Sequence, residues 1–210
     1  MKIKFKIISP YLYRKFFKVF QGDTSESLCQ GCDGLCETSR GFSTTVFLLP
    51  GELEFLKEAE IYPEMLLDPI ATSHGLIYCW SPAETCTYLQ NDRCLLGIDP
   101  GIKPVECAIY PLIFNRSNDG EFGICPVCRH RKAFLKNDFI GKAKTAMAEY
   151  ILPYLDQQWL AYRNELNFTI NEEAYHRLKK EKAGQAITIK EFKECATKPS
   201  IPPLTPFCKN

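Results

Sequence analysis

The alternation of apolar and polar positions predicts short strands in the first two thirds of the chain. Residues 2–7 alternate lysine with isoleucine or phenylalanine, a period of two that is typical of a half-buried strand. The apolar runs at 42–49 and 76–80 predict two more strands, and residues 121–124 predict another short one. Between 81 and 111 the pattern is short, turn-rich and interrupted by cysteine and proline.

Helical spacing is clearest at 11–20 and in the last third of the chain. Residues 11–20 place Leu12, Phe16, Phe17 and Phe20 on one helical face, which favours core packing over membrane contact. Pro50 is expected to open a short helix whose first turn carries Glu52 and Glu54, since carboxylates stabilise a helix N-terminus. Its buried side is expected to consist of Leu53, Phe55 and Leu56.

A long amphipathic helix is predicted over 132–152, ended or kinked by Pro153. The apolar stripe then continues to Leu166, and a polar, exposed helix is expected over 171–183. Residues 198–210 are a proline-rich tail. The apolar positions of the two stripes are Leu135, Phe139, Ala143, Met147, Ile151, Leu155, Trp159, Tyr162 and Leu166.

These elements indicate an α+β class: a small, loop-rich single domain with short strands and a C-terminal helical part. We divide it into a cysteine-cluster region, 1–131, and a helical extension with its tail, 132–210, packed on the same domain. The sequence shows no internal repeat and no convincing linker.

Charge and composition narrow the function classes. Lysine plus arginine number 26 against 25 aspartate plus glutamate, so no global charge favours nucleic acid or an anionic membrane. No stretch approaches the roughly 20 apolar residues of a membrane span, and no secretory signal is visible. The chain has 11 cysteines, an odd count that fits an all-disulfide secreted protein poorly. We therefore expect a cytoplasmic protein with reduced thiols.

The cysteines fall into an order that indicates metal ligation. Two C-x2-C pairs occur, each able to aim two sulfurs at one ion from a tight turn, and the others lie in turn-rich sequence. Buried free thiols are the alternative, and we assign that state to Cys79, which lies beside apolar residues. Cys195 and Cys208 lie in polar or tail sequence and are not expected to be ligands. The predicted ligands are Cys29, Cys32, Cys36, Cys86, Cys94, Cys107, Cys125 and Cys128.

An all-thiolate set suits zinc or an iron–sulfur cluster and excludes calcium or magnesium. Eight thiolates could form two zinc sites, or one four-ligand [4Fe–4S] cluster beside a zinc ion, and the sequence leaves both open. The three histidines offer no metal-binding spacing, and His130 is expected to be a surface residue. No nucleotide-binding or nucleophile motif is present.

The order of cysteines resembles the YkgJ-like cysteine-cluster family, described as zinc- or iron-chelating domains. That family's pattern is C-x2-C-x2-C-C, then a cysteine before a short aromatic-aliphatic segment, another cysteine, R-P-x2-C-R-x-Y-P, and C-P. The likeness spans roughly residues 29–128, but Leu35 occupies the third cysteine position, and Lys103 and Ala108 replace two arginines. The matching residues are Cys29, Cys32, Cys36, Cys86, Cys94, Cys107 in residues 103–111, and Cys125 with Pro126, while Cys128 is additional.

Two functions are compatible with these residues. The first is a metal-binding protein whose thiolates hold zinc or an iron or iron–sulfur centre, for a structural, redox or chelating role. The second is a cluster-dependent enzyme that modifies protein side chains, because flagellin lysine N-methylases carry a similar cysteine cluster. We favour the first, since no methyl-donor site is recognisable and the chain is short for that enzyme architecture. A metal ion is the only partner that the sequence indicates.

Overall fold

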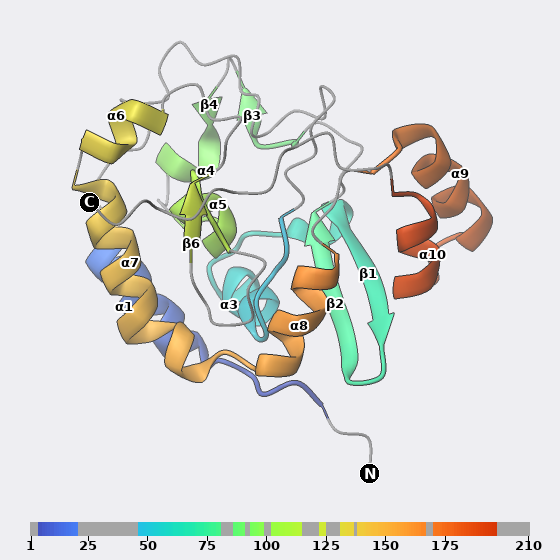
Figure 1. Ribbon diagram of the computed structural model, residues 1–210, viewed down its shortest axis with the longest axis horizontal. Helices are drawn as coiled ribbons and strands as arrows, with labels where there is room; N and C mark the ends of the chain where they lie inside the picture. The colour runs from blue at the N-terminus through green and yellow to red at the C-terminus, as the bar shows by residue number, and fades with distance from the viewer. Residues whose placement is uncertain are drawn as a thin grey trace.

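Short sheets and helices alternate along the chain and share one apolar core (Figure 1). The computed structural model describes residues 4–20, 46–80, 86–90, 93–98, 102–114, 122–124, 131–136, 138–166 and 170–196. The predicted α+β class is confirmed. The helices are α1 (Pro10–Phe20), α3 (Glu52–Glu58), η1 (Pro63–Leu66), α4 (Leu95–Ile98), α5 (Val105–Ile109), α6 (Arg131–Lys136), α7 (Phe139–Tyr150), η2 (Leu152–Tyr154), α8 (Gln157–Glu165), α9 (Glu172–Lys182) and α10 (Ile189–Glu194).

Three small sheets lie among these helices. In one sheet the strand order is β2-β1-β7, with β1 and β2 antiparallel and β7 parallel to β1. The other two are the antiparallel pairs β3-β4 and β5-β6. The strands are β1 (Leu67–Thr72), β2 (Gly75–Trp80), β3 (Leu89–Gln90), β4 (Arg93–Cys94), β5 (Leu112–Phe114), β6 (Phe122–Ile124) and β7 (Ile187–Thr188).

Helix α1 forms as predicted and packs against α3 and α7. The ring of Phe17 stacks on Phe55 of α3 with centroids 5.6 Å apart, and Phe20 meets Phe139 of α7 edge-on at 5.2 Å. The figure shows α1 and α7 running side by side along one edge of the molecule (Figure 1). Helix α1 therefore packs its aromatic face into the core of the protein rather than presenting it to a partner.

The predicted long helix over 132–152 is wrong in one respect, since the chain forms two helices, α6 and α7, instead of one. Phe134 and Phe139 are both 1% exposed, and their rings meet edge-on at 5.1 Å. Residues five apart lie about 140° apart around a continuous helix, so one helix could not bury both rings in the same place. The break also leaves Leu135, an expected core position, 50% exposed.

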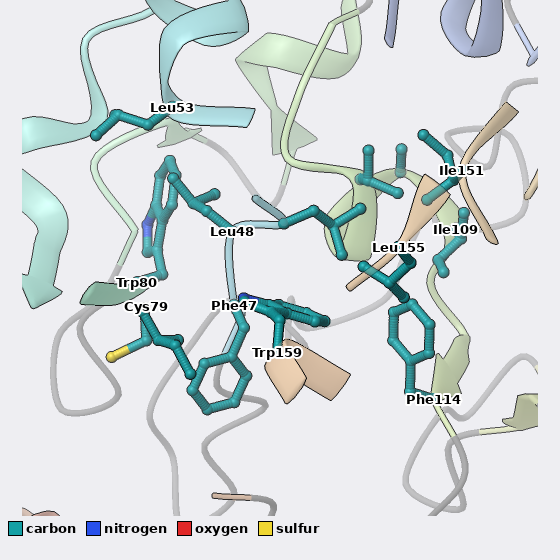
Figure 2. Packing of buried hydrophobic residues seen from close by; sticks show 14 of the residues in the cluster. Phe47, Leu48, Leu53, Cys79, Trp80, Ile109, Phe114, Ile151, Leu155 and Trp159 are labelled. Atoms are coloured by element: carbon teal, nitrogen blue, oxygen red, sulfur yellow. The ribbon is translucent and has the colours of Figure 1, made fainter. Parts of the chain in front are cut away.

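Helix α8 contributes the centre of the core. Asp156 caps it by accepting hydrogen bonds from Gln158 N at 2.8 Å and Trp159 N at 3.2 Å. The indole of Trp159 lies beside Phe47 and Phe114 in the close-up view, and its centroid is 6.3 Å from that of Phe114 (Figure 2). The apolar stripe predicted after Pro153 is confirmed. Leu155, Trp159 and Leu166 are buried, and Tyr162 is half-buried.

Two predicted strands are not formed in the residues that the structure describes. Residues 4–7 carry no sheet pairing; Phe5 N donates to the His74 carbonyl at 3.3 Å instead. Over 46–49 the predicted strand is reduced to one bridge, between Phe47 and Cys79. Residues 46–48 do lie along the free edge of β2, because Leu48 N donates to the Tyr78 carbonyl at 2.9 Å and Trp80 N donates to the Val46 carbonyl at 2.8 Å, but this pairing is too short to form a strand.

The C-terminal elements are bound to the β1–β2 sheet. The expected exposed helix, α9, buries one residue completely, Tyr175, whose hydroxyl donates to Asp68 of β1. Lys179 forms an ion pair with the same carboxylate at 3.2 Å. Helix α10 starts with a capping box between Thr188 and Glu191, and its Phe192 is fully buried. Residues 198–210, predicted to be a tail, lie outside the described residues.

Candidate metal centre

Three of the predicted ligands, Cys86, Cys94 and Cys107, lie in the described part of the chain. All three are half-buried, the condition expected of thiols that line a site at the edge of a core. The remaining predicted ligands lie outside the described residues; they are Cys29, Cys32, Cys36, Cys125 and Cys128.

Cys94 belongs to the short hairpin formed by β3 and β4, and Cys86 lies three residues before β3. Cys94 lies opposite Leu89, three residues after Cys86, and Leu95 N donates to the Tyr88 carbonyl at 2.9 Å. Both cysteines pack against the apolar core. Cys94 thus lies within the hairpin and Cys86 lies shortly before it, eight residues apart in the sequence.

Tyr88 attaches this hairpin to the sheet. Its ring centroid lies 6.2 Å from that of Trp80, the last residue of β2. Burial is the main cause of a pKa of Tyr88 above the ordinary value, and the charge of a Cys86 thiolate raises it further.

Cys107 lies on α5, a five-residue helix. Pro104 precedes its first turn, and a cis peptide bond joins Tyr110 to Pro111 after its end. A helix this short is not stable by itself, so other elements must set the position of Cys107.

Buried charged side chains supply that support. Glu52 of α3, fully buried, accepts hydrogen bonds from Leu49 N at 2.7 Å and from Val105 N, the first residue of α5. Glu106, directly before Cys107, accepts from Phe47 N at 2.9 Å. We call Glu52, Glu106 and Arg163 the α5 bracket.

Arg163 of α8 completes the bracket. Its Nε donates to Glu106 Oε1 at 2.8 Å, and both side chains are almost fully buried. Its guanidinium lies 5.4 Å from the ring centroid of Phe47 and 5.5 Å from that of Phe114, where cation–π attraction partly replaces hydration. One donor of this guanidinium, Nη1, is buried without a hydrogen-bond partner. The bracket thus fixes the first two residues of α5, directly before Cys107, from two other helices.

The bracket carries more acid than base. Burial raises the pKa of Glu52 to about 8, two backbone N–H donors oppose that shift, and the charge of Glu106 adds to it. Arg163, which is always protonated, balances Glu106 instead. From the sequence, Glu52 is expected only to stabilise a helix N-terminus, and no pattern points to Glu106 or Arg163, which are 57 residues apart and meet through the fold.

The chemistry of the three described thiols fits a soft metal such as zinc or iron. No group of three or more histidine, cysteine, aspartate or glutamate side chains that could hold a metal ion occurs within the described ranges. A four-ligand site would therefore need donors from residues outside those ranges, and five predicted ligands lie there.

Two cysteines outside the predicted ligand set are buried in the core. Cys79 is completely buried and its thiol donates to the Asp68 carbonyl at 3.5 Å, as expected of a core residue. Cys195, at the end of α10, is also buried. Burial raises the pKa of both thiols, so both stay protonated at neutral pH and are poor metal ligands as they stand.

The described histidines give no competing metal site. His74, at the turn between β1 and β2, shares hydrogen bonds of 3.0 Å with Ser73 Oγ and Tyr162 OH, and His176 is exposed on α9. His130 lies outside the described residues. No helix within the described ranges is long and apolar enough to cross a membrane.

The chain matches no protein-family model, and no curated protein or solved structure is similar enough to count as a match. The likeness to the YkgJ-like family therefore stays a prediction that rests on the cysteine pattern quoted above.

Proposed function

We propose that this protein binds metal, as zinc or an iron–sulfur centre, through thiolates that converge from several loops. The observation that carries the proposal is the ordered cysteine set, with two C-x2-C pairs and further cysteines in turn-rich sequence. Supporting it, Cys94 lies on a short hairpin, Cys86 lies three residues before that hairpin, and Cys107 lies on a helix that buried side chains hold in place. The metal orders the loops that carry its ligands, because binding and folding are coupled in such sites.

Purification without oxygen, followed by metal and sulfide analysis and a visible spectrum, tests the proposal directly. Stoichiometric zinc in a colourless protein would identify a zinc site, whereas iron with inorganic sulfide and a brown colour would identify a cluster. A protein that carries neither metal, and takes up none when zinc or iron and sulfide are supplied, would contradict the proposal.

Substitution of single cysteines by serine locates the ligands. We expect Cys32→Ser and Cys107→Ser to lower metal content, because thiolate is the ligand that these metals require. Cys208→Ser is the matched control, since this cysteine lies in the proline-rich tail. Equal metal loss from Cys208→Ser and Cys32→Ser would show the ligand assignment to be wrong.

Alkylation distinguishes ligation from disulfide bonding. Metal-bound thiolates should resist alkylation in the loaded protein and react once a chelator removes the ion. Disulfides would resist under both conditions until a reductant is added. Peptide mass spectrometry then reports the state of each cysteine separately.

A further inference from the structure

The α5 bracket connects the element that carries Cys107 with two helices elsewhere in the chain. Glu106 uses its two oxygens on different partners: one accepts from Phe47 N at 2.9 Å and the other from Arg163 Nε at 2.8 Å. Glu52 of α3 accepts a hydrogen bond from Val105 N, the first N–H of α5. Cys107 lies two residues after Val105 and directly after Glu106, so its position can change little unless these contacts break.

We infer that Glu106 is a positioning residue of the metal centre, which acts through its hydrogen bonds to Arg163 and to Phe47 N to hold Cys107 where its thiolate meets the ion. This inference rests on the proposed function. Both oxygens of Glu106 accept hydrogen bonds from N–H donors, so its contacts assign it to holding α5 rather than to the metal. Ligand-orienting residues of this kind commonly change metal affinity by 10–100-fold when they are replaced.

The energetics of the bracket favour this role over one in stability alone. Removing the Glu106 carboxylate and the Arg163 guanidinium from water is costly, and apolar replacements of buried ion pairs are often as stable. An ion pair of this type gives geometric precision, because its bonds are directional and short. The bracket applies that precision to the one described helix that carries a predicted ligand.

A second buried carboxylate provides a matched control. Asp68 of β1 accepts from the Tyr175 hydroxyl and pairs with Lys179 at 3.2 Å, so its burial and partners resemble those of Glu106. Its side-chain partners lie on α9, and it contacts none of the predicted ligands in these interactions. Asp68→Asn should therefore destabilise the fold without a specific effect on metal.

The experiment compares Glu106→Gln and Asp68→Asn with the wild-type chain by titration with Co²⁺ and by the rate of Zn²⁺ release to a chelator. We expect Glu106→Gln to weaken Co²⁺ binding about tenfold or more and to alter the sulfur-to-cobalt absorption bands. We expect Asp68→Asn to lower the unfolding midpoint while its Co²⁺ spectrum and affinity match the wild type. Alkylation of the metal-loaded Glu106→Gln protein should occur first at Cys107.

Substitutions of Arg163 supply a second test, which does not require the Glu106→Gln protein to fold. Arg163→Lys keeps the positive charge beside Glu106 and should bind Co²⁺ more tightly than Arg163→Gln, which removes it. Equal affinities for these two variants, or equal losses in Glu106→Gln and Asp68→Asn, would overturn the inference and leave metal binding intact. A wild-type chain that takes up neither Co²⁺ nor Zn²⁺ would overturn the proposed function as well.

Discussion

At the residue scale, the core contains an unusual concentration of charge for its size. Glu52 and Arg163 are 0% and 4% exposed, and Glu106 lies between them with its side chain 9% exposed. Only one formal positive charge faces the two carboxyl groups among these three side chains, so both carboxylates cannot be ionised without cost. Glu52 is the carboxyl group that holds a proton: its pKa is raised to about 8, so it is largely protonated at neutral pH.

The raised pKa of Glu52 predicts a dependence of stability on pH. The folded state holds its proton up to a pH of about 8, whereas the unfolded chain releases it near 4.5. The stabilising contribution is thus complete below pH 4.5 and is lost as the pH rises to about 8. The loss amounts to several kcal/mol, on the order of 1.4 kcal/mol for each pKa unit.

Chemical denaturation at pH 5, 6, 7 and 8 measures this dependence. Glu52→Gln should remove most of the decline, and Glu54→Gln, which changes an exposed carboxylate in the same helical turn, should leave it unchanged. If the wild type and Glu52→Gln lose stability in parallel over this range, Glu52 is ionised in the folded protein and the reasoning is wrong.

The residues of the bracket also mark the limit of what the sequence could reveal about the candidate site. Cysteine ligands are recognised by residue type and spacing, so the candidate ligands could be named from the sequence. In the sequence, Glu106 is a variable position within the motif at residues 103–111. Arg163 is a polar residue beside the apolar stripe that follows Pro153. Their roles arise from contacts between segments 57 residues apart, and periodicity carries no information about such contacts.

At the element scale, helices were more predictable than strands. The apolar faces of α1 and α8 follow from spacing within the helix itself, and both formed as expected. Strand β1 was not predicted, because Pro69 interrupts its apolar pattern, yet it pairs with β2 from Leu67 to Thr72. A strand depends on partners distant in the sequence, and β7, its other neighbour, lies more than 100 residues further along the chain.

The break between α6 and α7 gives a prediction about two neighbouring apolar residues. Phe139 is buried between Phe20 and Phe134, so Phe139→Ala should lower the free energy of unfolding by about 3–5 kcal/mol. Leu135→Ala should change it by no more than about 0.5 kcal/mol, because half of that side chain is exposed. A continuous helix would bury both residues on one face, and comparable losses from the two variants would support it over the broken one.

At the scale of the whole molecule, the two ends of the described chain are built into the same core. Helix α1 packs on α7, and β7 with α10 extends the sheet that β1 and β2 begin. In the ribbon view α9 and α10 lie beside β1, while α7 and α1 occupy the opposite edge (Figure 1). Elements from the C-terminal third thus close both sides of the molecule, so we expect residues 4–20 and 46–196 to unfold together.

The two tryptophans allow that cooperativity to be measured. Trp80 lies at the end of β2 and Trp159 lies in α8, and both are buried. Trp80→Phe leaves Trp159 as the fluorescent reporter and removes an indole N–H that has no hydrogen-bond partner, so the fold should tolerate it. Trp159→Phe leaves Trp80 as the reporter in the other part of the chain.

We expect the two single-tryptophan proteins, at one fixed metal content, each to unfold in one transition whose midpoint agrees with that protein's far-ultraviolet circular dichroism. Phe192→Ala, added to each, removes a fully buried ring of α10 that meets Tyr175 edge-on at 5.7 Å. Because α10 contacts β1, this change should lower the unfolding free energy reported by Trp80 and by Trp159 by the same amount, about 3–5 kcal/mol. Lys190→Ala, which changes an exposed residue of α10, is the control and should shift both reports by no more than about 0.5 kcal/mol. A loss seen by one tryptophan alone would mean that the C-terminal third unfolds separately, and the division of the chain near residue 131 would then be one between independent folding units.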